Sequence, residues 1–262
     1  MKEATSFTFN GVNSIDMGVI LADDSSGLFE EQFMTPYKAN FNTNQFTGKT
    51  VHTRDQREPI KFKLLIYLEK WQERNNLREI TRWLYPLEDG HFPLEFDNYP
   101  NRMVYARVSE FDSLKHNGVQ QGYFEVEFTT NDSYVSSNPL FTEPLQVSGS
   151  TVFEIKNDGD IPMLPRVWFI KKGKGSLEIR NDKTGKTLKI DELLPNEKLY
   201  IDNAQRLILS SQEEVTVYRA NNHNRIWLEI QPDYLTNTPT KLTIIGEGEI
   251  QFELQEKYNT WF

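Results

Sequence analysis

Alternation of apolar and polar residues in the second half of the chain limits its possible folds most strongly. Within residues 157–202, Leu177 and Ile179 alternate with polar residues, as do Leu188 and Ile190 beyond a polar turn. This period of two is typical of strands with one face in a core and one in water. The segment contains no histidine or cysteine. It therefore predicts a β-hairpin that packs in a core, and it offers no reactive group.

The remaining patterns predict two mainly β domains with a single helix. Apolar spacing becomes helical only over 69–84, and Tyr85-Pro86 ends that helix, because a residue before proline disfavours the α region. The segment 131–144 is rich in Asn, Ser and Pro, which indicates a boundary between domains at 1–138 and 139–262. Further strands are predicted at 60–68, 93–96, 103–108 and 123–128, and as short segments at regular spacing between 152 and 254.

Composition excludes several classes of function. The chain has 262 residues, a formal net charge of −9 and no clustered Lys and Arg, which argues against nucleic-acid binding. Cysteine is absent, so disulfides and cysteine catalysis are excluded. No apolar run approaches the roughly 20 residues that span a bilayer, and residues 1–6 lack the apolar core of a signal peptide. We therefore expect no membrane partner and no signal peptide.

Two segments, 47–50 and 184–187, share the sequence Thr-Gly-Lys-Thr with phosphate-binding loops. A functional phosphate-binding loop needs a second glycine five residues before the glycine of this segment, and a helix that starts at the lysine. Thr43 and Arg180 occupy those earlier positions, and strand patterns follow both segments. Both segments are therefore predicted to be hairpin turns, and no nucleotide cofactor is expected.

Histidines and carboxylates give little support to catalysis or metal binding. His52, His91, His116 and His223 lack the i, i+4 spacing of a metal pair, so they are expected at the surface. Glu125 and Glu127 would share one strand face, which permits a glycosidase groove but is more typical of a solvent face. We expect no enzyme, cofactor or metal. The tryptophans at 71, 83, 168 and 227 are expected in cores, whereas Trp261 and Phe262 are freer to contact a partner.

Several short motifs, in their order, resemble a known family. They are Phe7-Thr8-Phe9-Asn10-Gly11-Val12-Asn13-Ser14, the helix end at 77–84, and Leu94-Glu95-Phe96-Asp97-Asn98-Tyr99-Pro100 with Tyr105-Ala106-Arg107. The second half adds Asn157-Asp158-Gly159-Asp160, Leu177-Glu178-Ile179, Thr184-Gly185-Lys186 and Leu199-Tyr200-Ile201-Asp202. Over essentially its whole length, the chain resembles the distal tail (Dit) proteins of long-tailed, noncontractile phages that infect Gram-positive bacteria.

This resemblance implies a fold and a role. The fold would be an N-terminal, tail-tube-like β-sandwich with one flanking α-helix, followed by a C-terminal galectin-like or jelly-roll β-sandwich. The protein would be a structural hub at the virion tail tip, made in the host cytoplasm. Six copies would form a ring that joins the tail-tube protein to a tail-associated tip protein and to receptor-binding or baseplate proteins. The family implies no enzyme activity. Two alternatives remain: a carbohydrate-binding β-sandwich module that attaches to the host cell wall, and a tail-tube subunit.

A closed ring needs extensive head-to-tail contacts, and two polar segments of the predicted first domain are candidates for them. These segments are 23–31 and 40–58, which are too polar for a core and too long for simple turns. The predicted contact residues are Asp23, Asp24, Glu30, Glu31, Gln45, His52, Arg54 and Arg57, together with the aromatic pair Trp261 and Phe262.

Overall fold

The chain forms two compact units, each described here by itself. The computed structural model describes residues 6–22, 35–68, 74–116, 118, 122–212, 219 and 221–261. The first unit comprises Met1–Ser136 with Asn259–Phe262, and the second comprises Ser137–Tyr258. The last residues of the chain therefore group with the first unit, whereas the sequence placed them in the second domain.

The first unit is built on an antiparallel sheet with the strand order β2-β1-β7-β8-β10-β6-β3. Its central ladder joins β6 and β10, with Phe128 opposite Phe62 and Val126 opposite Leu64. These strands follow the predicted alternation, because every second residue is buried and the residues between them face outward. The strands are β1 (Phe7–Phe9), β2 (Val12–Asn13), β3 (Val19–Leu21), β6 (Lys61–Leu68), β7 (Phe92–Phe96), β8 (Met103–Phe111) and β10 (Gly122–Thr130), with the short β9 (Lys115–His116) and β11 (Val135–Ser136) beside them.

Aromatic rings fill the core of this unit. Phe7 on β1 lies 6.4 Å from Phe128 on β10, although β7 and β8 separate these strands in the sheet order. The sheet must therefore curl, which brings its ends together around the core. The helix α1 (Arg74–Leu84) covers this core with Trp83, whose ring stacks on Phe7 at 5.5 Å and whose indole N–H donates to the Phe9 carbonyl at 2.8 Å. A buried indole with a satisfied N–H fixes the helix on the sheet.

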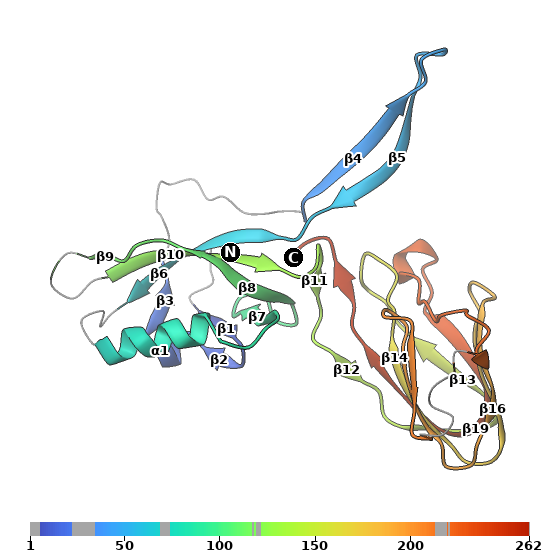
Figure 1. The fold of residues 1–262 in the computed structure, drawn as a ribbon. Coiled ribbons are helices and arrows are strands. Elements are labelled where there is room, and N and C mark those ends of the chain that lie inside the picture. The colour runs from blue at the N-terminus through green and yellow to red at the C-terminus, as the bar shows by residue number, and fades with distance from the viewer. Residues whose placement is uncertain are drawn as a thin grey trace. The chain divides into compact units, whose positions relative to one another are not determined.

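The second unit is a sandwich whose two layers share one long strand, β19 (Thr240–Leu254). Its first half pairs with β15 and its second half pairs with β14, while β13 follows β19 along the other edge. The strand order is β16-β15-β19-β14-β17-β18. The other strands of this sheet are β12 (Leu140–Phe141), β13 (Leu145–Ile155), β14 (Arg166–Lys171), β15 (Gly175–Asn181), β16 (Thr187–Leu193), β17 (Lys198–Asp202) and β18 (Leu207–Ser210) (Figure 1). The short β20 (Lys257–Tyr258) is not part of it.

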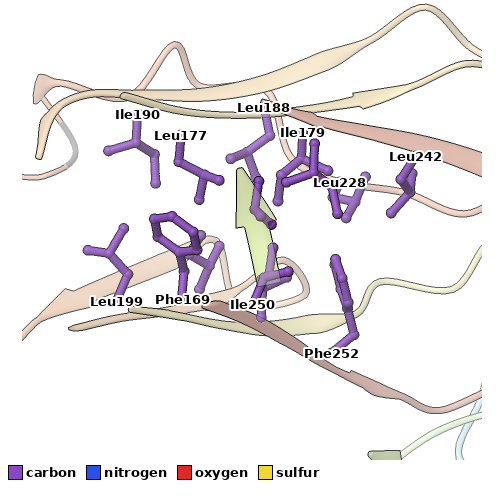
Figure 2. Packing of buried hydrophobic residues seen from close by; sticks show 14 of the residues in the cluster. Phe169, Leu177, Ile179, Leu188, Ile190, Leu199, Leu228, Leu242, Ile250 and Phe252 are labelled. Atoms are coloured by element: carbon purple, nitrogen blue, oxygen red, sulfur yellow. The ribbon is translucent and has the colours of Figure 1, made fainter. Parts of the chain in front are cut away.

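Side chains from both layers meet in the core of the second unit. Figure 2 shows Leu177 and Ile190 pointing from one layer toward Phe169 and Ile250 of the other. All four are fully buried, as the alternation in β14, β15 and β16 predicts. The strand β19 passes from one layer to the other between Gly246 and Gly248, where β19 changes its neighbour from β15 to β14. The predicted fold class, mainly β with a flanking helix in the first half and a galectin-like sandwich in the second, is confirmed.

The tryptophans divide differently from the prediction. Trp83 is buried, as expected, and Trp227 packs partly buried against the second core. Trp168 is a correction, because it is only half-buried and points to the outer face of β14 while its neighbours Val167 and Phe169 fill the core. Alternation alone does not say which of two apolar sets faces inward. Trp71 lies outside the described residues.

Candidate functional site

A two-stranded hairpin, β4 (Tyr37–Thr43) with β5 (Thr50–Arg57), occupies the polar segment that was predicted to make contacts. Its ladder runs from Tyr37 opposite Arg57 to Thr43 opposite Thr50. The two strands form a sheet of their own, and nearly all of their residues are exposed (Figure 1, blue). We call this element the β4–β5 hairpin.

The tip of the β4–β5 hairpin is held in one shape by a single asparagine. The Asn44 side-chain oxygen accepts the backbone N–H groups of Phe46 and Thr47 at 2.9 and 3.2 Å. The N–H of Gly48 donates to the Asn44 carbonyl at 2.8 Å, and Gly48 has a φ of 65°, which favours glycine. Phe46 is consequently presented with its side chain fully exposed.

The same turn occurs in the second unit, between β15 and β16. The Asn181 side-chain oxygen accepts the N–H groups of Lys183 and Thr184, and the N–H of Gly185 donates to the Asn181 carbonyl. Strands, and not helices, follow both Thr-Gly-Lys-Thr segments. The prediction that these segments are hairpin turns is confirmed, and the phosphate-loop alternative is excluded for them.

Apolar side chains on the β4–β5 hairpin face water. Tyr37, Phe41 and Val51 are each at least half exposed, and Phe46 is 100% exposed. An isolated two-stranded hairpin is at best marginally stable in water. Both outer edges also present unpaired backbone groups within the described part of the chain, and such edges readily pair with another chain. The hairpin therefore has the properties of a surface that becomes buried on assembly.

The base of the β4–β5 hairpin is fixed to the rest of the first unit by Arg57. Its guanidinium donates to the side-chain oxygens of Thr35 and Asn259 at 3.2 and 2.9 Å, and it lies 4.8 Å from the centre of the Tyr134 ring. Arg57, a predicted contact residue, therefore anchors the hairpin within the chain. The anchor leaves the tip as the part that extends outward.

The other predicted contact residues fall into three groups. Gln45 and Arg54 are exposed on the β4–β5 hairpin, and His52 pairs there with Asp55 at 2.8 Å. Trp261 is buried at 6% exposure and packs on Phe62, Phe96 and Tyr99, so its ring closes the first unit and is not an exposed contact. The predicted residues that lie outside the described part of the chain are Asp23, Asp24, Glu30, Glu31 and Phe262.

The carboxylates considered for a glycosidase lie on an open sheet face of the first unit. Glu125 pairs with Lys63 across the ladder at 2.7 Å, and Glu127 accepts a hydrogen bond from the Ser109 hydroxyl at 3.1 Å. Both carboxylates come from alternate positions of one strand and point the same way. A glycosidase needs two carboxylates facing each other across the bond that breaks, and this pair does not. In the described ranges, no group of three or more His, Cys, Asp or Glu side chains has the arrangement of a metal site.

His223 corrects the prediction that all four histidines lie at the surface. Its side chain is buried in the second unit, its Nε2 lies 2.9 Å from the Ile226 carbonyl, and its ring contacts Trp227 at 4.6 Å. Burial lowers the pKa of His223 below its ordinary value of 6.5, and the hydrogen bond to Ile226 opposes this only in part.

The lowered pKa of His223 predicts acid sensitivity of the second unit. The unfolded chain binds a proton at this site more readily than the folded chain does, so the stabilisation is complete above about pH 6.5 and declines as the pH falls below it. Urea unfolding at pH 7.5 and pH 5.5 measures this loss. We expect His223→Gln to reduce the difference between the two pH values, whereas His91→Gln, at an exposed site, leaves it unchanged. An identical pH dependence in both variants would contradict this assignment.

Together, these features define a two-unit β protein. Its first unit carries the β4–β5 hairpin with exposed apolar side chains, while Glu125 and Glu127 lie on an open sheet face and His223 is buried in the second unit. In the described ranges, no helix has both the length and the apolar character to cross a membrane.

Comparison with known proteins identifies the family. Residues 2–132 match the family model described as "Phage tail protein N-terminal domain", and residues 142–254 match the one described as "Phage tail C-terminal domain". The chain belongs to this family of phage tail proteins. It is 25% identical over 260 residues to the SPbeta prophage-derived uncharacterized protein YomH of Bacillus subtilis (strain 168), covering 98% of this chain and 99% of that protein.

Solved structures share the fold. The Dit protein of phage SPP1, described as a paradigm of the hub adsorption apparatus in phages infecting Gram-positive bacteria, matches with a TM-score of 0.69 at 14% identity, covering 95% of this chain and 98% of that one. A chain of the phage p2 baseplate in its activated conformation matches with a TM-score of 0.51 at 8% identity, covering 97% and 99%. The resemblance to Dit proteins that the sequence motifs predicted is thus confirmed in fold, and the chain belongs to a family of phage tail proteins.

Proposed function

We propose that this protein is a structural hub of a phage tail tip, and that it assembles into a ring through the β4–β5 hairpin. The observation that carries the proposal is the exposure of Phe46 at a hydrogen-bonded tip, on a hairpin that pairs with no other described strand. The family membership and the fold shared with SPP1 Dit support a place in the tail.

The ring contains six copies, sits at the end of the tail tube and carries tip and receptor-binding or baseplate proteins. In a closed ring, each copy offers one surface and receives a different one. The anchored base and the ordered tip of the hairpin suit the offered surface, because little conformational freedom is lost when such an element binds. The protein works by assembly and not by catalysis, and its location is the virion tail tip. A tail-tube subunit is a poorer description, because the second unit adds a complete sandwich to the chain.

Removal of the Phe46 ring tests the proposal. Sedimentation velocity over a wide concentration range, with negative-stain images of the purified protein, is expected to show ring-sized particles for the unchanged chain. A central apolar anchor contributes about 2 kcal/mol or more to an interface, so Phe46→Ala should raise the concentration at half-assembly about 30-fold.

Leu87→Ala is the matched control, because Leu87 is 97% exposed in the same unit but lies outside the β4–β5 hairpin. It should assemble as the unchanged chain does. Thermal unfolding should also be the same in all three proteins, since neither side chain contributes to a core. Equal assembly of Phe46→Ala and Leu87→Ala would remove the hairpin tip from the interface.

A further inference from the structure

The outer face of one layer of the second unit carries a row of aromatic and apolar side chains across neighbouring strands. Trp168 on β14 lies opposite Tyr200 on β17, which lies opposite Leu209 on β18. The rings of Phe141 and Trp168 are 5.7 Å apart, and those of Trp168 and Tyr200 are 5.3 Å apart. We call Phe141, Trp168, Tyr200 and Leu209 the aromatic face.

The rings of the aromatic face are accessible to a ligand. Phe141 is 54% exposed and Leu209 is 49% exposed, while Trp168 and Tyr200 are half-buried. The core of this layer is already complete beneath them, because Phe169 and Ile201 point inward from the same strands and are fully buried. These outward rings are therefore not needed to fill the sandwich.

A fixed polar group borders the rings. Arg166 lies opposite both Asp202 and Glu253, two positions along β14 from Trp168 and hence on the same face. Its Nε pairs with Asp202 Oδ2 at 3.1 Å and its Nη1 with Glu253 Oε1 at 2.8 Å, while 44% of its side chain stays exposed. The Tyr200 hydroxyl donates to the same Asp202 oxygen at 3.3 Å.

Asp202 is itself held rigidly and stays charged. Its Oδ1 accepts the backbone N–H groups of Ala204 and Gln205 at 2.9 and 2.8 Å. Burial, the largest influence, acts to raise the pKa of Asp202, but the Gln205 N–H and the Arg166 guanidinium together hold that pKa below its usual range. Asp202 and Glu253 are themselves buried, and they hold the partly exposed Arg166 guanidinium in a fixed direction at the border of the aromatic face.

This combination of groups fits a sugar ring. The face of an aromatic ring is electron-rich and attracts the C–H groups on one side of a pyranose. The hydroxyls at the rim of the same sugar can accept hydrogen bonds, and they match a partly exposed guanidinium that is already oriented. Successive rings in a row offer successive stacking positions, which suits a chain of sugars.

Charge and composition decide between a glycan and other occupants. The positive charge of Arg166 lies between the negative charges of Asp202 and Glu253, so the site does not favour a polyanion. The cores of protein interfaces are depleted of charged residues, whereas Arg166, Asp202 and Glu253 form the neighbouring cross-strand row on the same face. We propose that the aromatic face of the second unit binds an uncharged glycan chain. This goes beyond the proposed hub function and does not depend on ring formation.

The test uses the full-length protein on an array of immobilised neutral oligosaccharides built from hexose, N-acetylhexosamine and deoxyhexose units, with poly(glycerol phosphate) as the anionic chain. We expect binding to one or more neutral chains. Trp168→Ala and Phe141→Ala should each weaken that binding about tenfold, which corresponds to the loss of one stacked ring. Trp168→Phe keeps a ring and should retain a substantial part of the affinity.

Tyr234→Ala is the matched control, because Tyr234 is a 61% exposed aromatic residue of the same unit that lies outside the aromatic face. It should bind as the unchanged protein does. If Trp168→Ala fails to fold, Phe141→Ala decides, since its ring is mostly in water. Binding to poly(glycerol phosphate) alone, no binding to any neutral chain, or equal binding by Phe141→Ala and Tyr234→Ala would each overturn the proposal. The assembly state measured for the same variants separates this result from a failure of the hub function.

Discussion

Gly248→Ala is expected to destabilise the second unit by about 4 kcal/mol, because a new methyl group there meets backbone and a core ring together. A Cβ at this position would lie 2.2 Å from the Ile170 carbonyl oxygen and 2.8 Å from the Phe169 ring. Both partners belong to β14, which pairs with β19 at this point. Neither a backbone carbonyl within a ladder nor a fully buried ring moves away easily.

Because of the position of Gly248, the substitution would disturb the pairing of two strands and not only the backbone around residue 248. Gly248 begins the half of β19 that pairs with β14, just after the half that pairs with β15. Displacing β19 from β14 there would open the junction between the two layers that enclose the core (Figure 2). For a unit of this size, a loss of about 4 kcal/mol corresponds to a fall in Tm of roughly 15 °C or more.

Differential scanning calorimetry measures this effect, and Gly149→Ala is the matched control. Gly149 lies opposite Gly246 in the β13–β19 ladder and has a φ of 77°, but nothing lies within 4 Å of its added Cβ. Its replacement should cost only the backbone strain, about 1 kcal/mol. Equal melting of the two variants would show that β19 tolerates a side chain at its transition between layers.

Alternation predicted much of both cores correctly, because in a strand with one solvent-exposed face every second side chain points into the core. The strand predicted at 60–68 has apolar residues at every second position, and all five are buried: Ile60, Phe62, Leu64, Ile66 and Leu68. The hairpin turns at 47–50 and 184–187 were also predictable, since an Asn three residues before each segment supplies the oxygen that closes the turn. These features are local, so a single sequence contains their cause.

The features that the sequence did not predict depend on contacts between distant residues. Lys171 begins the basic stretch 171–174, yet it is 2% exposed and donates to the Glu247 carbonyl at 3.1 Å. Trp168 alternates as a core residue does, but the register of β14 turns it outward beside Tyr200. Polarity alone singled out the segment that forms the β4–β5 hairpin, while the anchoring role of Arg57 needs Asn259, 202 positions away.

The buried ion pair between Arg219 and Glu197 is a second consequence of distant contacts, and its loss should have a comparably large effect. The two side chains are 1% and 0% exposed, and Arg219 binds both carboxylate oxygens of Glu197 at 2.7 Å. The same carboxylate accepts the Leu194 N–H at 2.8 Å and the Ser210 hydroxyl at 2.6 Å. One carboxylate thus joins the start of β17, the end of β18 and the chain beyond it.

Arg219→Met should destabilise the second unit by about 3–5 kcal/mol, because it leaves the Glu197 carboxylate buried without a counter-charge. The double variant Glu197→Gln with Arg219→Met removes both charges and keeps a carbonyl oxygen as an acceptor for the Leu194 N–H. The double variant should therefore regain a large part of the lost free energy of unfolding. It still lacks some of the original hydrogen bonds, but it no longer buries an unpaired charge. Urea unfolding at neutral pH measures all three proteins.

Arg180→Met is the matched control, because it removes an arginine from an exposed ion pair of the same unit. Arg180 pairs with Asp182 at 2.8 Å in the same unit, but the two side chains are 52% and 33% exposed, so about 0.5 kcal/mol is expected. A cost for Arg219→Met as small as that of Arg180→Met would mean that water reaches Glu197 in the folded chain. A double variant no more stable than Arg219→Met would instead assign the cost to lost packing, because only an unpaired charge is relieved by the second substitution.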